Sequence, residues 1–192
     1  EIMKEIEATF DESVDGFLPI AEGTYPAHCS KFDTNEWKNS KIFNLEFTIA
    51  DEAANLQVSK LRSDGNGGFV QEVDGDGKSV TVSASYMVGK KFKNNGVWLT
   101  PKPAPGESWK NRRYKEFFEA LGVDFPSSNG KVALAEVEES DVLGLPCLVD
   151  IKQQQFKNKE GESRTAMKVT SVFPWADGKK LSADELSSDV PF

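Results

Sequence analysis

Apolar and polar residues alternate along several short stretches of this chain, which is the spacing of a β-strand with one buried face. The clearest stretch spans residues 42–49, where every second residue is large and apolar. These residues are Phe43, Leu45, Phe47 and Ile49. Weaker alternation occurs over 16–31, 56–61, 69–73, 79–88, 144–156 and 164–173, with turn-forming runs of Gly, Asp and Asn between them.

One segment has helical spacing instead. It covers residues 108–121, follows the Pro-rich connector 101–106 and ends at Gly122. Phe117, Phe118 and Leu121 would form its apolar face. Residues 129–142 form either a second, acidic helix or a loop. About five to eight short strands with one inserted α-helix predict a mainly β fold, and a small, partly open barrel suits this pattern better than an α/β sheet.

The chain is long enough for a single hydrophobic core with tails. It has 192 residues, of which 38% are hydrophobic and 28% are charged. We expect an acidic N-terminal segment over 1–15, one β-rich domain over 16–176 and a disordered, acidic C-terminal tail over 177–192.

The charge of the chain is unevenly distributed. The net charge of -8 argues at first against a nucleic-acid partner. Six of the acidic residues, however, fall within residues 1–15, and four more fall within 177–192. Residues 86–118 carry eight basic residues against only Glu107 and Glu116. Such blocks are typical of a basic binding face that coexists with acidic tails.

Several classes of function are disfavoured by the residues present. His28 is the only histidine, and it neighbours Cys29 on a predicted strand, where adjacent side chains point to opposite faces. No phosphate-binding Gly-rich loop occurs. The acidic cluster at 136–141 could hold a nuclease metal, but a solvated face is the favoured interpretation. We therefore expect no enzyme activity, no cofactor and no metal.

Cys29 and Cys147 are expected to be reduced thiols in the core, because they lie far apart in apolar surroundings. No apolar run approaches the roughly 20 residues of a membrane span. We therefore expect a cytoplasmic protein with no membrane partner.

Basic and aromatic residues occur together in three stretches. Binding of unpaired strands without sequence preference needs cations for the phosphates and exposed rings on which bases stack. The stretches lie at 37–43, at 90–98 with 109–115, and at 152–164. Phe43 and Phe92 could equally belong to the core, whereas Trp37 and Trp109 have polar neighbours. The candidate DNA-binding residues are Trp37, Lys38, Lys41, Lys90, Lys91, Phe92, Lys93, Trp98, Trp109, Lys110, Arg112, Arg113, Lys115, Phe156 and Lys157.

The chain ends in an acidic stretch followed by an aromatic residue. A ring with an α-carboxylate can dock in an apolar pocket rimmed by basic residues, while nearby acids steer the encounter. The candidate partner-binding residues are Asp184, Glu185, Asp189, Val190, Pro191 and Phe192. This ending resembles the tail of bacterial and bacteriophage single-stranded-DNA-binding proteins, which closes with two acids, an aliphatic residue, Pro and Phe. Ser188 departs from that pattern, because the first acid is expected there.

The body of the chain is similar to phage-encoded single-strand binders with an OB (oligonucleotide-binding) fold. The similarity lies in Glu22-Gly23-Thr24-Tyr25, in the strand 43–47 and in the helix 114–121. It implies a five-stranded, partly open barrel with extra hairpins and a role in DNA replication, recombination or repair. It also implies partners such as a polymerase, helicase or primase in the bacterial host, and it leaves a homo-oligomer open. Two alternatives remain: a recombination or annealing factor, and an acidic protein-interaction module or inhibitor that mimics DNA.

Overall fold

The computed structural model describes residues 18–187, and it is mainly β, with 43% strand and 18% helix. The mainly β expectation is confirmed. The chain does not form one compact body: Ser59–Val82, together with the described residues up to Ala21, forms one unit, and Glu22–Val58 with the chain from Ser83 onward forms a larger one. The domain bounds expected from the sequence, 16–176, stay a prediction.

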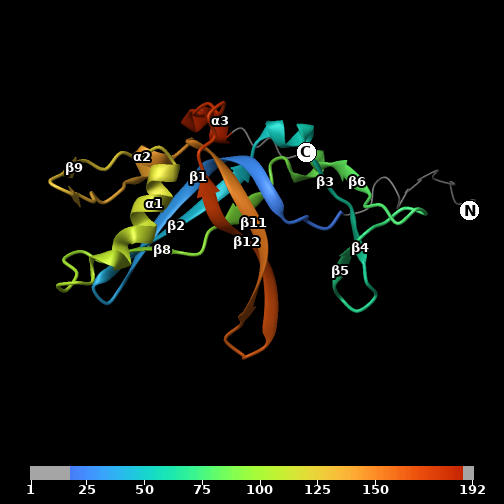
Figure 1. Cartoon of the computed structure of the whole chain (residues 1–192), viewed down its shortest axis with the longest axis horizontal. Coiled ribbons are helices and arrows are strands. Elements are labelled where there is room, and N and C mark those ends of the chain that lie inside the picture. The colour runs from blue at the N-terminus through green and yellow to red at the C-terminus, as the bar shows by residue number, and fades with distance from the viewer. Residues whose placement is uncertain (1–17, 188–192) are drawn as a thin grey trace, which may run out of the picture. The chain divides into compact units, whose positions relative to one another are not determined.

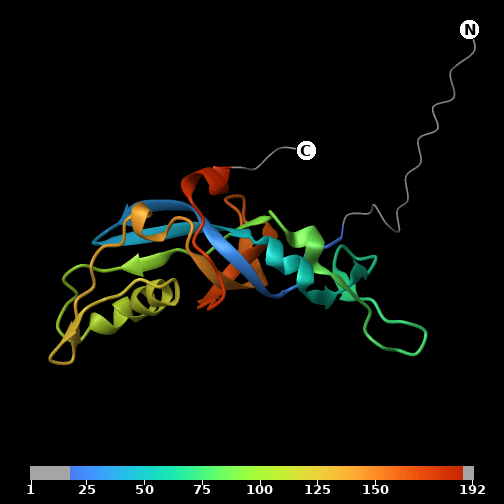
Figure 2. The ribbon, with the colours of Figure 1, turned by 90° about the horizontal axis from the view of Figure 1, so that it is seen from above.

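The larger unit is built on one antiparallel sheet (Figures 1 and 2). The strands follow the order β12-β11-β1-β2-β7, and β8 also pairs with β2. Two long hairpins make up most of the sheet, one from β1 and β2 and one from β11 and β12. The bounds are β1 Gly23–Trp37, β2 Ser40–Ile49, β7 Lys91–Lys93, β8 Val97–Leu99, β11 Pro146–Lys157 and β12 Ser163–Phe173.

Asn94 joins the two ends of this sheet. It lies just after β7 and makes a parallel bridge with Val169 of β12. Its side-chain oxygen accepts a hydrogen bond of 2.9 Å from the Leu45 backbone, so the amide extends the ladder of β2. This single bridge does not amount to a closed barrel, and none is detected in residues 18–187.

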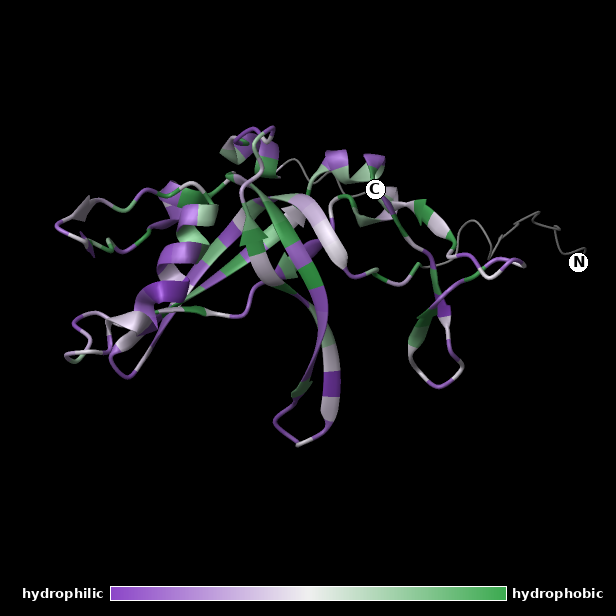
Figure 3. Cartoon of the chain, in the orientation of Figure 1, coloured by the Kyte–Doolittle hydropathy of each residue, from purple (hydrophilic) through white to green (hydrophobic). Residues whose placement is uncertain are grey.

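The core fills the inner face of the sheet. The alternation predicted for β2 is confirmed, because Phe43, Leu45, Phe47 and Ile49 are all buried. Figure 3 shows hydrophobic residues along the strands of the main sheet and hydrophilic ones around the tip of the β11–β12 hairpin. Burial of four such side chains stabilises the fold by roughly 1.5–3 kcal/mol each.

A helical segment of 13 residues covers one end of this core. It consists of the 3-10 turn η3 (Ser108–Asn111) and helix α1 (Arg112–Ala120), close to the expected 108–121. Tyr114 and Phe118 are buried, with ring centroids 5.1 and 5.6 Å from that of Phe43. The Tyr114 hydroxyl donates to the Ala135 carbonyl and accepts from the Val137 amide, each at 2.8 Å, which fixes the long connection to β11.

The remaining elements of the larger unit are short. The expected acidic helix or loop at 129–142 contains strand β10 and helix α2. The bounds are η1 Asp51–Asn55, β3 Gln57–Ser59, η2 Ala84–Met87, β9 Ser127–Ser128, β10 Lys131–Val132 and α2 Glu139–Val142. β9 pairs with β10, and β6 (Thr81–Ser83) spans the end of the small unit along the chain.

The small unit contains the hairpin of β4 (Leu61–Ser63) and β5 (Phe69–Gln71). The turn expected at 64–68 closes it. The carboxylate of Asp64 accepts the backbone amides of Asn66 and Gly68 at 2.7 and 2.9 Å, and these bonds lower its pKa.

The C-terminal tail differs in part from expectation. Residues 177–187 were expected to be disordered, but Leu181 donates to the Gly144 carbonyl at 2.9 Å, and Ala183–Ser187 form helix α3. Gly144 is held close, because a Cβ there would lie 2.1 Å from the Leu181 carbonyl oxygen. Sequence composition missed this segment because its contacts are made to residues far away in the chain. Residues 188–192 lie outside the described part of the structure.

Candidate nucleic-acid interface

Two long hairpins flank the outer face of β2, β7 and β8. Both hairpin tips point to the lower side of Figure 1. The β1–β2 tip is a two-residue turn between Trp37 and Ser40, in which Lys38 has a left-handed backbone with φ of 54°. The β11–β12 hairpin is tied to the β7–β8 turn, because the Asn95 amide donates to the Gln154 side chain at 2.9 Å. The two projections thus border one surface.

The strand register places two tryptophans on this outer face. Ile42 of β2 pairs with Asn35 on one side and with Trp98 on the other, and Trp37 pairs with Ser40 two residues away. Directly paired residues share a face of the sheet, as do residues two apart. Trp98 is 44% exposed and Trp37 is 60% exposed, so both rings are accessible to a ligand.

Gly96 lets β8 approach this face closely. A Cβ on Gly96 would lie 2.4 Å from the Ile42 Cγ2 methyl and 3.2 Å from the Asn44 side-chain oxygen. The Trp98 indole nitrogen would be 3.9 Å from the same point. A glycine is therefore required for this packing of Trp98 against β2.

The cations of this face come from both hairpin and sheet. Lys38 is at the β1–β2 tip, and Lys91 and Lys93 pair with Thr48 and Glu46 on the outer side of β2. Within residues 18–187, neither Lys38 nor Lys93 forms an ion pair. Lys90 precedes β7 and is half-buried.

Two candidate residues do not belong to this surface. Phe92 pairs with Phe47 on the inner face and is only 5% exposed, so its ring is part of the core. Lys41 also points inward: its ammonium binds the Glu136 carboxylate and lies 5.9 Å from the centroid of Phe43. The alternation of β2 implies this orientation for Lys41, since Phe43 is two residues away.

The β11–β12 tip has mixed charge. Phe156 is 49% exposed and lies opposite Arg164, next to Lys157. Arg164 is paired with Glu162 at 2.8 Å, and the Asn158 side chain organises the turn by accepting the amides of 160 and 162. Phe156 is two residues from Gln154, which contacts the β7–β8 turn, so its ring can contribute to the surface. Lys157 points to the opposite face of β11, and the charge of Arg164 is balanced locally.

The basic residues of the helical segment are largely neutralised. Lys110 pairs with Glu107, Arg112 with Glu116, and Lys115 with Glu119, at 2.6, 2.8 and 2.9 Å. The Glu116 side chain raises the pKa of Arg112. Counting charges along the sequence overlooked these pairs, although i,i+3 and i,i+4 spacing could have revealed them. Arg113 is exposed, and Trp109 is 68% exposed on η3.

Sequence reasoning missed several polar residues of the outer face. Asn35 and Asn44 are linked by a hydrogen bond of 2.9 Å, and Ser40 is linked to Thr100 at 2.9 Å. The signal available was the alternation of β2, whose polar positions are the outward ones. The search for basic and aromatic clusters passed over uncharged side chains.

The candidate partner-binding residues lie elsewhere. Asp184 and Glu185 are on α3, whereas Asp189, Val190, Pro191 and Phe192 lie outside the described residues. Glu185 caps its own helix, because its carboxylate accepts the Ser182 amide at 2.7 Å, which lowers its pKa. Its charge is thus already engaged.

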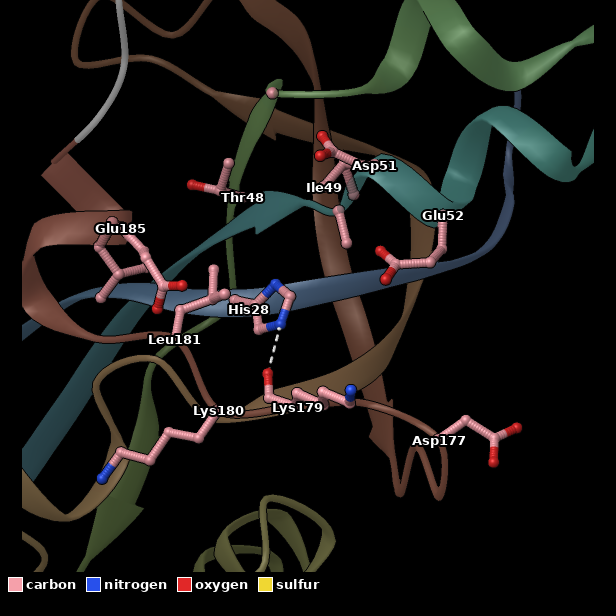
Figure 4. A pocket seen from close by; sticks show the side chains of 13 residues that line it. His28, Thr48, Ile49, Asp51, Glu52, Asp177, Lys179, Lys180, Leu181 and Glu185 are labelled. Atoms are coloured by element: carbon pink, nitrogen blue, oxygen red, sulfur yellow. Dashed lines mark hydrogen bonds between the residues drawn. The ribbon is translucent and has the colours of Figure 1, made fainter.

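The segment before α3 closes a cavity of about 700 Å³ (Figure 4). His28 lies on its floor, nearly buried, with Nε2 2.9 Å from the Lys179 carbonyl oxygen. Its ring centroid is 5.6 Å from that of Trp175. In Figure 4, Asp51 and Glu52 lie on one side of His28 and Glu185 on the other. His28 therefore has a structural role as the anchor of this segment.

Residues 18–187 contain no group of three or more His, Cys, Asp or Glu side chains that could hold a metal ion. Cys29 and Cys147 are buried and unbridged, as expected. Among the same residues, no helix has the length and apolarity needed to cross a bilayer. No known family model matches the chain, and no curated protein matches it in sequence.

Proposed function

We propose that this chain is a single-stranded-DNA-binding protein with an OB fold. It performs no chemistry, and it protects and organises DNA during replication, recombination or repair in the cytoplasm of a bacterial host. Its C-terminal end recruits a replication protein such as a polymerase, helicase or primase. The observation that carries the proposal is the pair of exposed indoles, Trp37 and Trp98, on a face that is bordered by two long hairpins.

The order of the strands supports the OB fold. β1, β2 and β7 follow one another in the sheet, and β11 returns by a long connection to lie beside β1. This order, fourth-first-second-third, is that of a Greek key, and the OB fold is a partly open Greek-key barrel. The parallel bridge between Asn94 and Val169 brings the fifth core strand next to the third.

The position of the outer face supports the choice of ligand. OB folds bind oligonucleotides on their second and third strands, between the loop that joins strands one and two and the loop that joins strands four and five. The corresponding elements here are β2, β7 with β8, and the two hairpin tips. Exposed rings and lysines are the groups that bases and phosphates require.

A gel-shift titration with oligo-dT at low salt tests the proposal. We expect binding that weakens as salt rises, because phosphate contacts release counterions. Trp98→Ala should weaken binding about 5- to 150-fold, since stacking contributes ~1–3 kcal/mol per base. Phe173→Ala is the matched control, because Phe173 is 45% exposed and lies at the end of β12 opposite the hairpin tip.

The outcomes separate the alternatives. A missing shift at low salt would contradict DNA binding and favour the acidic interaction module. A shift accompanied by active pairing of complementary strands, measured in an annealing assay, would instead favour a recombination or annealing factor.

A further inference from the structure

A second surface of the larger unit combines a groove, an exposed indole and basic residues. The groove has a volume of about 790 Å³ and lies between the chain that follows β8, the η3–α1 segment and the region of β10. Trp109, at 68% exposure, lies on its η3 wall, and Val132 is exposed on the opposite wall. Prolines 101 and 103 also line it, so that much of the wall is apolar.

The charge of the groove favours an anionic ligand. Four basic residues line it against one acid, Glu136, which already binds Lys41. Two of the four, Lys102 and Lys131, form no ion pair with any residue of 18–187, and both are exposed. An apolar wall with an exposed ring and unpaired ammonium groups is suited to a nucleobase and its phosphate.

The Asn111 side chain connects the η3 wall of this groove to the end of β8. Its side-chain oxygen accepts the Thr100 amide at 2.7 Å, and its amide donates to the Thr100 carbonyl at 3.0 Å. Trp109 is two residues before Asn111, and Trp98 is two residues before Thr100, about 7 Å along a strand. Asn111 is 8% exposed, so the two bonds are shielded from water. The clamp therefore holds the segments that carry the two tryptophans at a fixed relative position.

Thr100 is also where the two surfaces meet. Its hydroxyl is 2.9 Å from that of Ser40 at the β1–β2 tip. Thr100 and the following residue, Pro101, also line the groove. Thr100 therefore provides a direct connection between the outer face and the groove.

We infer that the groove beside Trp109 is a second subsite for the same DNA strand, which continues from the outer face past Thr100 and stacks a base on Trp109. This inference rests on the proposed function. The subsite extends the DNA-binding surface beyond the sheet and the two hairpin tips. Lys102 and Lys131 contact the phosphates of the added nucleotides.

A length series of oligo-dT tests the subsite in the full chain. Affinities are measured for strands of about 4 to about 16 nucleotides, the range of site sizes for one OB fold. With Trp109→Ala, we expect a loss of about 5- to 150-fold that is confined to strands long enough to reach the groove. Lys131→Gln should reduce the salt dependence for the same long strands only. Circular dichroism confirms that each variant is folded.

The outcomes are distinguishable. Loss on long strands only supports the subsite. Unchanged affinity at every length, or an equal loss at every length, overturns it, the latter because Trp109 would then belong to the first site. If the wild-type chain binds no strand of any length, the proposed function itself fails. Phe173→Ala again serves as the control, with no expected change at any length.

Discussion

Phe92 and Trp98 lie on opposite faces of the sheet, so the ring of Phe92 is buried and that of Trp98 is partly exposed. Phe92→Ala removes a ring buried against Phe47 and should lower the free energy of unfolding by about 3–5 kcal/mol. Trp98→Ala should lower it by about 1 kcal/mol or less, because the ring is partly exposed. Urea denaturation of both variants measures the difference. Equal destabilisation would contradict the assignment of Phe92 to the core and Trp98 to the surface.

Burial also perturbs the two thiols. Desolvation raises the pKa of Cys29 to about 12, and it raises the pKa of Cys147 further. Between pH 8.5 and these values, the unfolded chain loses thiol protons that the folded chain retains, so stability must fall as pH rises. The expected fall between pH 8.5 and 10 is up to about 2 kcal/mol per thiol.

The double variant Cys29→Ala/Cys147→Ala provides the comparison for this pH dependence. Its free energy of unfolding, measured in urea at pH 8, 9 and 10, should change less with pH than that of the wild type. Burial raises the pKa of Tyr114 from 10 to about 12. Measurements between pH 8 and 10 therefore exclude most of the contribution that Tyr114 makes to the pH dependence of stability. Parallel pH profiles for the two proteins would contradict the role of the thiols.

At the scale of elements, the clamp between Asn111 and Thr100 joins η3 to the end of β8. Asn111→Ala leaves the Thr100 amide and carbonyl without partners in a largely buried position. We expect a loss of about 1–3 kcal/mol in the free energy of unfolding. Lys110→Ala is the control, because within residues 18–187 the Lys110 ammonium makes one exposed ion pair, with Glu107, which contributes about 1 kcal/mol or less. An equal effect of the two variants would show that the clamp adds nothing.

Local patterns predicted the elements better than they predicted the surface. The alternation of β2, the helix after the Pro-rich connector and the last hairpin were all apparent, because each depends on neighbouring residues. The ion pair of Lys41 was not apparent, because its partner, Glu136, lies 95 positions away in the chain. The role of His28 depends in the same way on Lys179, 151 positions away. Which cations remain unpaired thus depends on the register and packing of distant segments, which no local pattern contains.

For the whole molecule, the proposed function requires that a chain with a net charge of -8 bind a polyanion. Lys38 lies at the β1–β2 tip, at the other end of β2 from Thr48, which lines the same cavity as Glu185 of α3. At physiological salt the Debye length is about 8 Å, so distant acids repel DNA only weakly. An acidic group close to the lysines would have a larger effect, because it competes directly with DNA for them.

The C-terminal end provides a test of that competition. Glu185 is engaged with Ser182 on α3, so the deletion of 188–192 removes the carboxylate of Asp189 and keeps every residue of α3. Oligo-dT affinity at low salt should stay equal or rise, whereas partner binding should be abolished. Any rise should vanish at high salt, because screening weakens the attraction between tail and lysines. The deletion of 184–192 should have the same effect on DNA, and Ser188→Ala, which changes no charge, should have none. Weaker DNA binding after either deletion would contradict competition between the tail and DNA for the lysines. It would indicate instead that the tail contributes directly to DNA binding.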